Sequence, residues 1–127
     1  MTATEMNHFT VLTNDLENSV SFYTEILGLE EGFRPNLGFP GCWLYKNQRA
    51  ILHIISGKKL PSEPSGVLDH MAFSAENLPE TIDKLKTRKI DYELKRQNET
   101  NTWQLFFVDP NGAKVELDFD SSEKSSA

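Results

Sequence analysis

The sequence predicts an α+β fold in which one β-α-β-β-β unit is written twice in tandem. Two observations support it. A strand-like run of alternating apolar and polar residues is centred on His8, and a second is centred on His70, 62 positions later (70 − 8). Each run is followed by a helical pattern of apolar residues, which begins at Leu16 and again at Leu78, also 62 positions apart (78 − 16). Both halves of the chain therefore carry the same order of elements.

The first repeat spans about residues 6–56. After its opening strand, Asn14 or Asp15 is the expected helix N-cap, and Gly28 ends the helix because glycine tolerates the left-handed conformation there. A tight polar turn at 47–48 joins the last two strands. The predicted elements are a strand at 6–12, a helix at 16–27, and strands at 30–34, 42–46 and 49–56.

The second repeat spans about residues 68–119. Its helix places Pro79 in the first turn, where the missing N–H costs nothing. Asp109-Pro110-Asn111-Gly112 predicts the turn of the last hairpin. The predicted elements are a strand at 68–74, a helix from about 78, and strands at 92–96, 103–108 and 113–119.

Length and composition indicate a single domain over residues 1–127. The segment 57–67 contains two prolines and two lysines and is expected to link the repeats. The polar, serine-rich residues 120–127 are expected to be disordered.

The charge pattern excludes some partners. A net charge of −6 argues against nucleic acid, which requires a basic face. No apolar run approaches the length of a membrane span, and the N-terminus lacks the pattern of a secretory signal. The single cysteine, Cys42, excludes an internal disulfide. These features predict a cytoplasmic protein that binds neither nucleic acid nor membrane.

A third pair of matching runs places His53 and Glu116 63 positions apart (116 − 53). The three histidines of the chain and Glu116 thus occupy repeat-equivalent strand positions, and their apolar neighbours point to the opposite face of each strand. Taken singly, each residue has a simpler interpretation: a structural histidine, or a glutamate on a half-exposed strand. Together, imidazoles with one carboxylate predict a site for one divalent metal: Zn, Ni, Fe, Mn or Co.

The sequence resembles the vicinal oxygen chelate superfamily, which includes glyoxalase I, bleomycin-resistance proteins and extradiol dioxygenases. The motifs that carry the resemblance are Asn7-His8-Phe9, Asp15-Leu16 through Leu27-Gly28-Leu29, Asp69-His70-Met71-Ala72-Phe73, and Phe107-Val108-Asp109-Pro110-Asn111-Gly112 leading to Val115-Glu116-Leu117.

This resemblance implies paired βαβββ modules that form a cup-shaped, mostly antiparallel sheet around a divalent metal, with the helices on the outer face. It makes His8, His70 and Glu116 the metal ligands. His53 falls where glyoxalase I has a glutamate that is both ligand and catalytic base. His53 is accordingly a candidate fourth ligand or base, and Glu116 is a candidate for the catalytic group as well as a ligand.

Several other residues are candidates for contacts with a small-molecule substrate. Aromatic and apolar side chains on the cup strands would line the site, and an arginine would pair with an anionic substrate group. The alternatives are ordinary core packing and a solvated surface arginine. The candidates are Trp43, Trp103, Leu105, Phe107 and Arg34.

Three functions remain open on the sequence. The favoured one is a metal-dependent, glyoxalase-like lyase or isomerase that acts through a metal-stabilised enediolate on a small molecule with vicinal oxygens. An Fe(II) extradiol-type dioxygenase is the alternative, and it is favoured if His53 stays off the metal. The third is a metal-free module that binds a drug. Open sheet edges further predict a homodimer.

Overall fold

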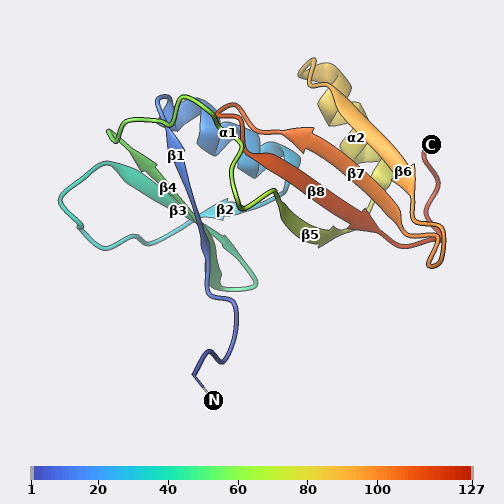
Figure 1. Cartoon of the computed structure of the whole chain (residues 1–127), viewed down its shortest axis with the longest axis horizontal. Coiled ribbons are helices and arrows are strands. Elements are labelled where there is room, and N and C mark those ends of the chain that lie inside the picture. The colour runs from blue at the N-terminus through green and yellow to red at the C-terminus, as the bar shows by residue number, and fades with distance from the viewer. Residues whose placement is uncertain (1, 127) are drawn as a thin grey trace. The chain divides into compact units, whose positions relative to one another are not determined.

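The computed structural model describes residues 2–126. The chain forms two compact units, which divide between Ser62 and Glu63, inside the segment expected to link the repeats. The elements run in chain order along the ribbon in Figure 1. They are β1 (Phe9–Thr13), α1 (Leu16–Ile26), β2 (Glu30–Glu31), β3 (Gly41–Lys46), β4 (Arg49–Ser56), β5 (Met71–Ala75), α2 (Leu78–Thr87), β6 (Tyr92–Arg96), β7 (Trp103–Val108) and β8 (Lys114–Phe119).

Each unit contains one helix and one four-stranded open sheet. The strand orders are β1-β4-β3-β2 and β5-β8-β7-β6, so the two sheets have the same topology. In each sheet the first strand pairs in parallel with the last, and the other pairs are antiparallel. The predicted α+β fold with two βαβββ modules is therefore confirmed.

Local signals explain where the first helix and its neighbouring turns lie. The Asp15 side chain accepts a hydrogen bond from the Asn18 backbone N–H at 3.1 Å, which satisfies one free donor at the start of α1. Gly28 follows the helix with φ +71°, as its C-terminal position predicts. Asn47 and Gln48 both have positive φ, which a two-residue hairpin turn requires to match strand twist.

Three predicted strands differ at their ends by more than one residue. β1 and β5 begin at Phe9 and Met71, so His8 and His70 lie one residue before their strands instead of inside them. β2 is only two residues long. Beyond β2 the Gly32 N–H still donates to the Trp43 carbonyl at 3.3 Å, the Phe33 carbonyl accepts from the Tyr45 hydroxyl at 2.6 Å, and Pro35 has no N–H to donate.

The predicted disordered tail, residues 120–127, also differs. Both carboxylate oxygens of Glu123 accept hydrogen bonds at 2.7 Å, from the backbone N–H groups of Asn77 and Leu78. The Trp103 indole N–H donates to the Glu123 carbonyl at 2.7 Å. These contacts hold Glu123 against the start of α2; Ala127, the end of the predicted tail, lies outside the described residues.

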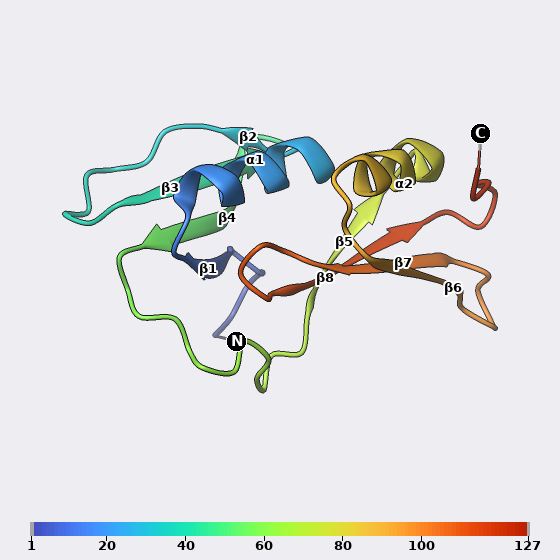
Figure 2. The same ribbon diagram turned by 90° about the horizontal axis from the view of Figure 1, so that it is seen from above.

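Each helix lies on one side of its own sheet, as Figure 2 shows. The apolar side chains that point to this side are almost fully buried, and they alternate along the strands with residues of the other side. We call the side without the helix the open face of each sheet. Buried residues on the helix side include Leu52, Ile54, Leu105, Phe107, Val115 and Leu117. No helix among the described residues is long and apolar enough to cross a membrane.

Candidate metal centre

On the open face of the first sheet, two histidines and a tryptophan form a stack of three rings. Strand register places Trp43 directly opposite His53. The Trp43 and His53 rings are 4.0 Å apart and tilted by 11°, and the His8 and His53 rings are 3.7 Å apart and tilted by 13°. The structure therefore brings His8 and His53 together, as the repeat predicts, with Trp43 packed against them.

The first histidine of each repeat is held by the residue before it. His8 Nδ1 lies 2.7 Å from Asn7 Oδ1, and His70 Nδ1 lies 2.8 Å from Asp69 Oδ2. Because these oxygens only accept, the Nδ1 atoms are the donors. Nε2 of His8 is therefore the nitrogen that can meet a ligand, whereas Nε2 of His70 faces the Glu116 carboxylate. A metal-binding histidine usually donates the N–H of its other ring nitrogen to an acceptor outside the metal's own ligands.

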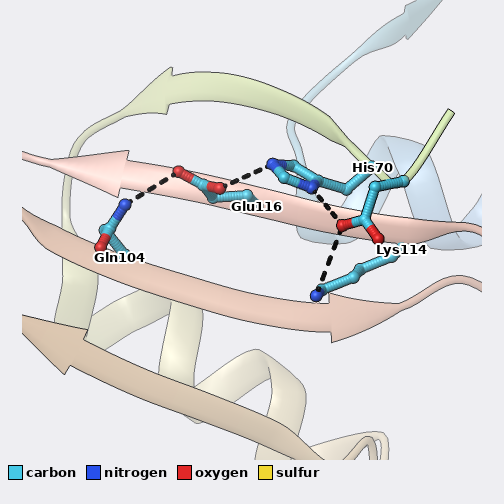
Figure 3. A network of polar contacts seen from close by, with 5 residues as sticks. His70, Gln104, Lys114 and Glu116 are labelled. Carbon is cyan, nitrogen blue, oxygen red and sulfur yellow. Dashed lines mark hydrogen bonds and ion pairs between the residues drawn. The ribbon is translucent and has the colours of Figure 1, made fainter.

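In the second unit, His70 meets Glu116. His70 Nε2 lies 3.0 Å from Glu116 Oε1, and the Gln104 side-chain amide donates to Glu116 Oε2 at 3.4 Å. Figure 3 shows this chain of contacts continuing from His70 through Asp69 to Lys114. Glu116 is only 7% exposed, so its carboxylate is buried beside a half-exposed imidazole. A buried carboxylate of this kind requires a cation or donors nearby.

A second acidic side chain adjoins the pair. Asp118 lies two residues from Glu116 on β8 and so shares its face. Burial, together with the hydrogen bond and negative charge of Glu116, raises the pKa of Asp118 to about 6. The hydrogen bond to His70, followed by the charge of Lys114, instead lowers the pKa of Asp69.

His53 differs from the other histidines in which nitrogen is bound. Its Nε2 lies 3.2 Å from the Ala50 carbonyl, an acceptor, so Nε2 carries the proton and Nδ1 has the free lone pair. Burial, followed by the charge of His8, lowers the pKa of His53, and the charge of Arg34 adds to this. Because the lone pairs of stacked, nearly parallel rings do not converge, His8 and His53 do not meet one ion in this arrangement.

The donor set of each unit fits part of a divalent-metal site. Each unit brings together two of the four predicted residues: His8 with His53, and His70 with Glu116. Within residues 2–126 no group of three or more His, Cys, Asp or Glu side chains is arranged to hold a metal. Each unit by itself thus supplies a pair of the predicted residues and not a full ligand set.

Three predicted substrate contacts do not lie on the open face. Trp103, Leu105 and Phe107 pair with residues of the helix side, and Leu105 and Phe107 are 0% and 3% exposed. Their core-packing alternative agrees with this placement. The reason is strand register, which assigns alternate residues to opposite faces and which sequence alone leaves undecided. The open face of β7 instead presents Gln104 and Phe106, opposite Asp118 and Glu116.

Sequence reasoning overlooked the residues that support the histidines. Asn7 and Asp69 are themselves 62 positions apart (69 − 7), so the repeat contained the signal. Asp118 could be inferred from its spacing of two from Glu116. Gln104 could not, because only the β7–β8 register places it there.

Comparison with known proteins agrees with this architecture. The family model of the Glyoxalase/Bleomycin resistance protein/Dioxygenase superfamily matches residues 5–117. The chain belongs to this superfamily. Within it, the chain is 32% identical to "Glyoxylase I 4" of Arabidopsis thaliana over 90% of this chain and 70% of that protein. It is 29% identical to "Glutathione transferase FosA" of Serratia marcescens, over 88% and 78%.

A solved superfamily structure has the same fold. A mutant of the fosfomycin resistance protein FosX from Listeria monocytogenes superposes with a TM-score of 0.76 at 16% identity, covering 94% of this chain and 95% of that one. That structure was obtained in complex with Mn(II) and 1S,2S-dihydroxypropylphosphonic acid. At this level of identity the likeness shows the fold alone.

Proposed function

We propose that the protein is a divalent-metal-dependent enzyme, a glyoxalase-like lyase or isomerase acting on a small molecule with adjacent oxygens. The observation that carries this proposal is the way both histidines are held. His8 and His70 each engage a neighbouring oxygen through Nδ1, so Nε2 is the nitrogen that would bind a metal. Nε2 of His70 lies 3.0 Å from Oε1 of Glu116, a second predicted ligand, and a bound metal would replace this contact.

In this proposal His8, His70 and Glu116 are the ligands of one ion, Zn, Ni, Fe, Mn or Co. The ion would replace the contact between His70 Nε2 and Glu116 Oε1, and the glutamate would lower the net positive charge of the site. Bound there, such an ion would supply Lewis acidity toward a substrate carbonyl.

His53 is proposed as the proton-transfer group. Its Nε2–H is directed to the Ala50 carbonyl, which fixes the tautomer and leaves the Nδ1 lone pair to accept a proton from substrate. Stacking between His8 and Trp43 holds the ring in place. Loss of His53 should therefore reduce turnover more than metal retention.

The similarity to a protein named for glyoxalase I and to the glutathione transferase FosA supports chemistry on a small organic molecule. Thiohemiacetals and α-hydroxycarbonyls offer the adjacent oxygens that a bidentate site requires. Thioesters with an α-oxo group are a further class to assay.

One observation favours a second candidate, an Fe(II) extradiol-type dioxygenase. If His53 stays off the metal, as its stacking on His8 indicates, a three-ligand octahedral ion would have three open positions. A bidentate catecholate and O₂ would fill them.

Metal analysis tests the site, and a substrate panel tests the reaction. Wild-type protein should bind one metal per complete site, and His70→Ala and Glu116→Gln should lose most of it while circular dichroism stays unchanged. His53→Ala should keep the metal. Full metal occupancy in His70→Ala would contradict the ligand set.

The panel of hemithioacetals, α-oxo thioesters and catechols is assayed with and without air after loading with Ni, Zn, Mn or Fe(II). Turnover without O₂ is expected. Turnover restricted to Fe(II), a catechol and O₂ would select the dioxygenase. Tight binding of an apolar drug with no turnover would instead select the sequestering module.

A further inference from the structure

Two nitrogens of the Arg34 guanidinium lack hydrogen-bond partners. The Nε and Nη2 atoms are buried, and neither has an acceptor among the described residues. An arginine is always charged and carries five N–H donors in a planar fork. Burying such donors without acceptors costs free energy that a bound anion would recover.

The guanidinium lies next to Gly41, at the start of β3. Gly41 pairs with Ile55 and Trp43 pairs with His53, so all four positions share one face. A Cβ built on Gly41 would clash with the Ile54 backbone carbonyl oxygen and would lie 2.8 Å from Nη2 and 3.0 Å from Cζ of Arg34. The guanidinium therefore occupies the space that a side chain at position 41 would fill, two residues along β3 from Trp43.

The side chains around Arg34 orient its guanidinium but supply no counter-charge among the described residues. The Phe39 ring lies 5.1 Å from Cζ, a cation–π distance that fixes the guanidinium but provides no oxygen acceptor. No carboxylate of the described residues forms an ion pair with it.

Arg49 of the same unit is a useful contrast. Its Nη2 donates to the Met6 carbonyl at 2.9 Å and lies 3.7 Å from Glu5, and its side chain is 50% exposed. The Nη2 group of Arg49 thus has acceptors within the protein, whereas that of Arg34 has none among residues 2–126.

We propose that Arg34 binds the anionic group of the substrate, a carboxylate or a phosphonate, through its forked N–H donors close to Gly41 on β3, once the atoms that cover Nε and Nη2 move aside. The inference rests on the proposed function for the identity of the ligand as substrate, and it narrows the substrate class to anions that also carry adjacent oxygens. Arginine is suited to this because its planar fork matches two oxygens of either group.

The test is an NMR titration of the full-length protein, labelled with ¹⁵N and loaded with Zn. Methylphosphonate and acetate are the two anionic probes, and 1,2-propanediol is the neutral one. The Nε–Hε signal of Arg34 should shift and saturate with at least one anion, and the stronger anion identifies the group. Propanediol should leave this signal in place.

Two variants complete the design. Arg34→Met should weaken binding of the stronger anion at least about tenfold, the effect of losing a charged hydrogen-bond pair, while Arg49→Met removes the same charge and should bind like wild type. Because the wild-type signal is read directly, the result does not depend on Arg34→Met folding. Unchanged affinity in a folded Arg34→Met, or an Arg34 signal that does not move, overturns the proposal.

Metal analysis of the wild type distinguishes failure of the proposed function from failure of the anion site. If the proposed function is wrong, metal binding to the wild type fails while the shift of Arg34 with the anion persists. If only the anion site is wrong, wild-type protein binds metal and the Arg34 signal stays unperturbed.

Discussion

The two supporting residues of the histidines differ in charge, although they occupy equivalent positions. Asn7 presents a neutral amide oxygen to His8, whereas Asp69 presents a carboxylate to His70. The hydrogen bond from His70 and the charge of Lys114 lower the pKa of Asp69, so this carboxylate stays ionised. An ionised acceptor makes the imidazole a stronger ligand than an amide does.

Asp69→Ala should therefore weaken metal binding roughly 10- to 100-fold, the usual effect of removing an outer partner of a metal ligand. Asp69→Asn retains an acceptor oxygen and should lose less. A competitive chelator titration measures both, with the same-unit substitution Asp91→Asn as the control. Equal affinity for wild type and Asp69→Ala would contradict the supporting role.

Cys42 should react slowly with alkylating reagents. Burial, followed by the hydrogen bond and charge of Glu31, raises the pKa of the Cys42 thiol from 9.0 to about 11. The thiolate is the reactive form, so at about pH 8 alkylation should be about a hundredfold slower than for an unperturbed thiol. The rate should increase about tenfold for each pH unit up to about pH 10.

Iodoacetamide labelling followed by mass spectrometry measures the rate, and labelling in urea provides the unperturbed reference. If the rate stopped increasing at about pH 9, the pKa of the Cys42 thiol would not be raised.

The two helices begin in different ways, although their repeats match. Asp15 caps α1 from within the local sequence. At α2, Asn77 adopts a left-handed conformation and makes no capping hydrogen bond with its side chain. The Glu123 carboxylate, which lies 45 and 46 residues later in the sequence, accepts instead from the N–H groups of Leu78 and Asn77. Its negative charge also suits the positive end of the helix dipole.

Glu123→Ala should consequently lower the free energy of unfolding by about 1–2 kcal/mol, as the loss of a helix cap does. Urea denaturation measures the change, with Glu99→Gln on an exposed loop of the same unit as the control. The same free energy in Glu123→Ala and wild type would mean that water replaces the cap without cost.

Among the described residues, each sheet has two outer strands that pair with a neighbour on one side only. β1 and β2 are the edges of the first sheet, and β5 and β6 are the edges of the second. Open edges and open faces favour association with another copy, which would cover them.

We therefore expect a homodimer with twice the 14.5 kDa mass of the chain. Sedimentation velocity at micromolar concentration measures the mass. A chain that sediments as a monomer throughout this range, in the presence of the bound metal, would contradict the expectation.

Most local elements of the fold were predictable from residues close together in sequence. The α1 cap at Asp15, the left-handed Gly28 and the turn at 47–48 depend on contacts within about four residues. The repeat of 62 residues likewise showed which positions of the two halves are equivalent, and so identified His8 and His70 as a matched pair.

The tertiary structure alone decided which side chains meet. Glu116 lies beside His70 because β5 and β8 pair in parallel, and Leu105 is a core residue because the β7–β8 register turns it to the helix side. Glu123 caps α2 because the chain returns past that helix. A sequence pattern reports the alternation along one strand, but the partner and register depend on strands tens of residues apart, and a slip of one residue exchanges the two faces.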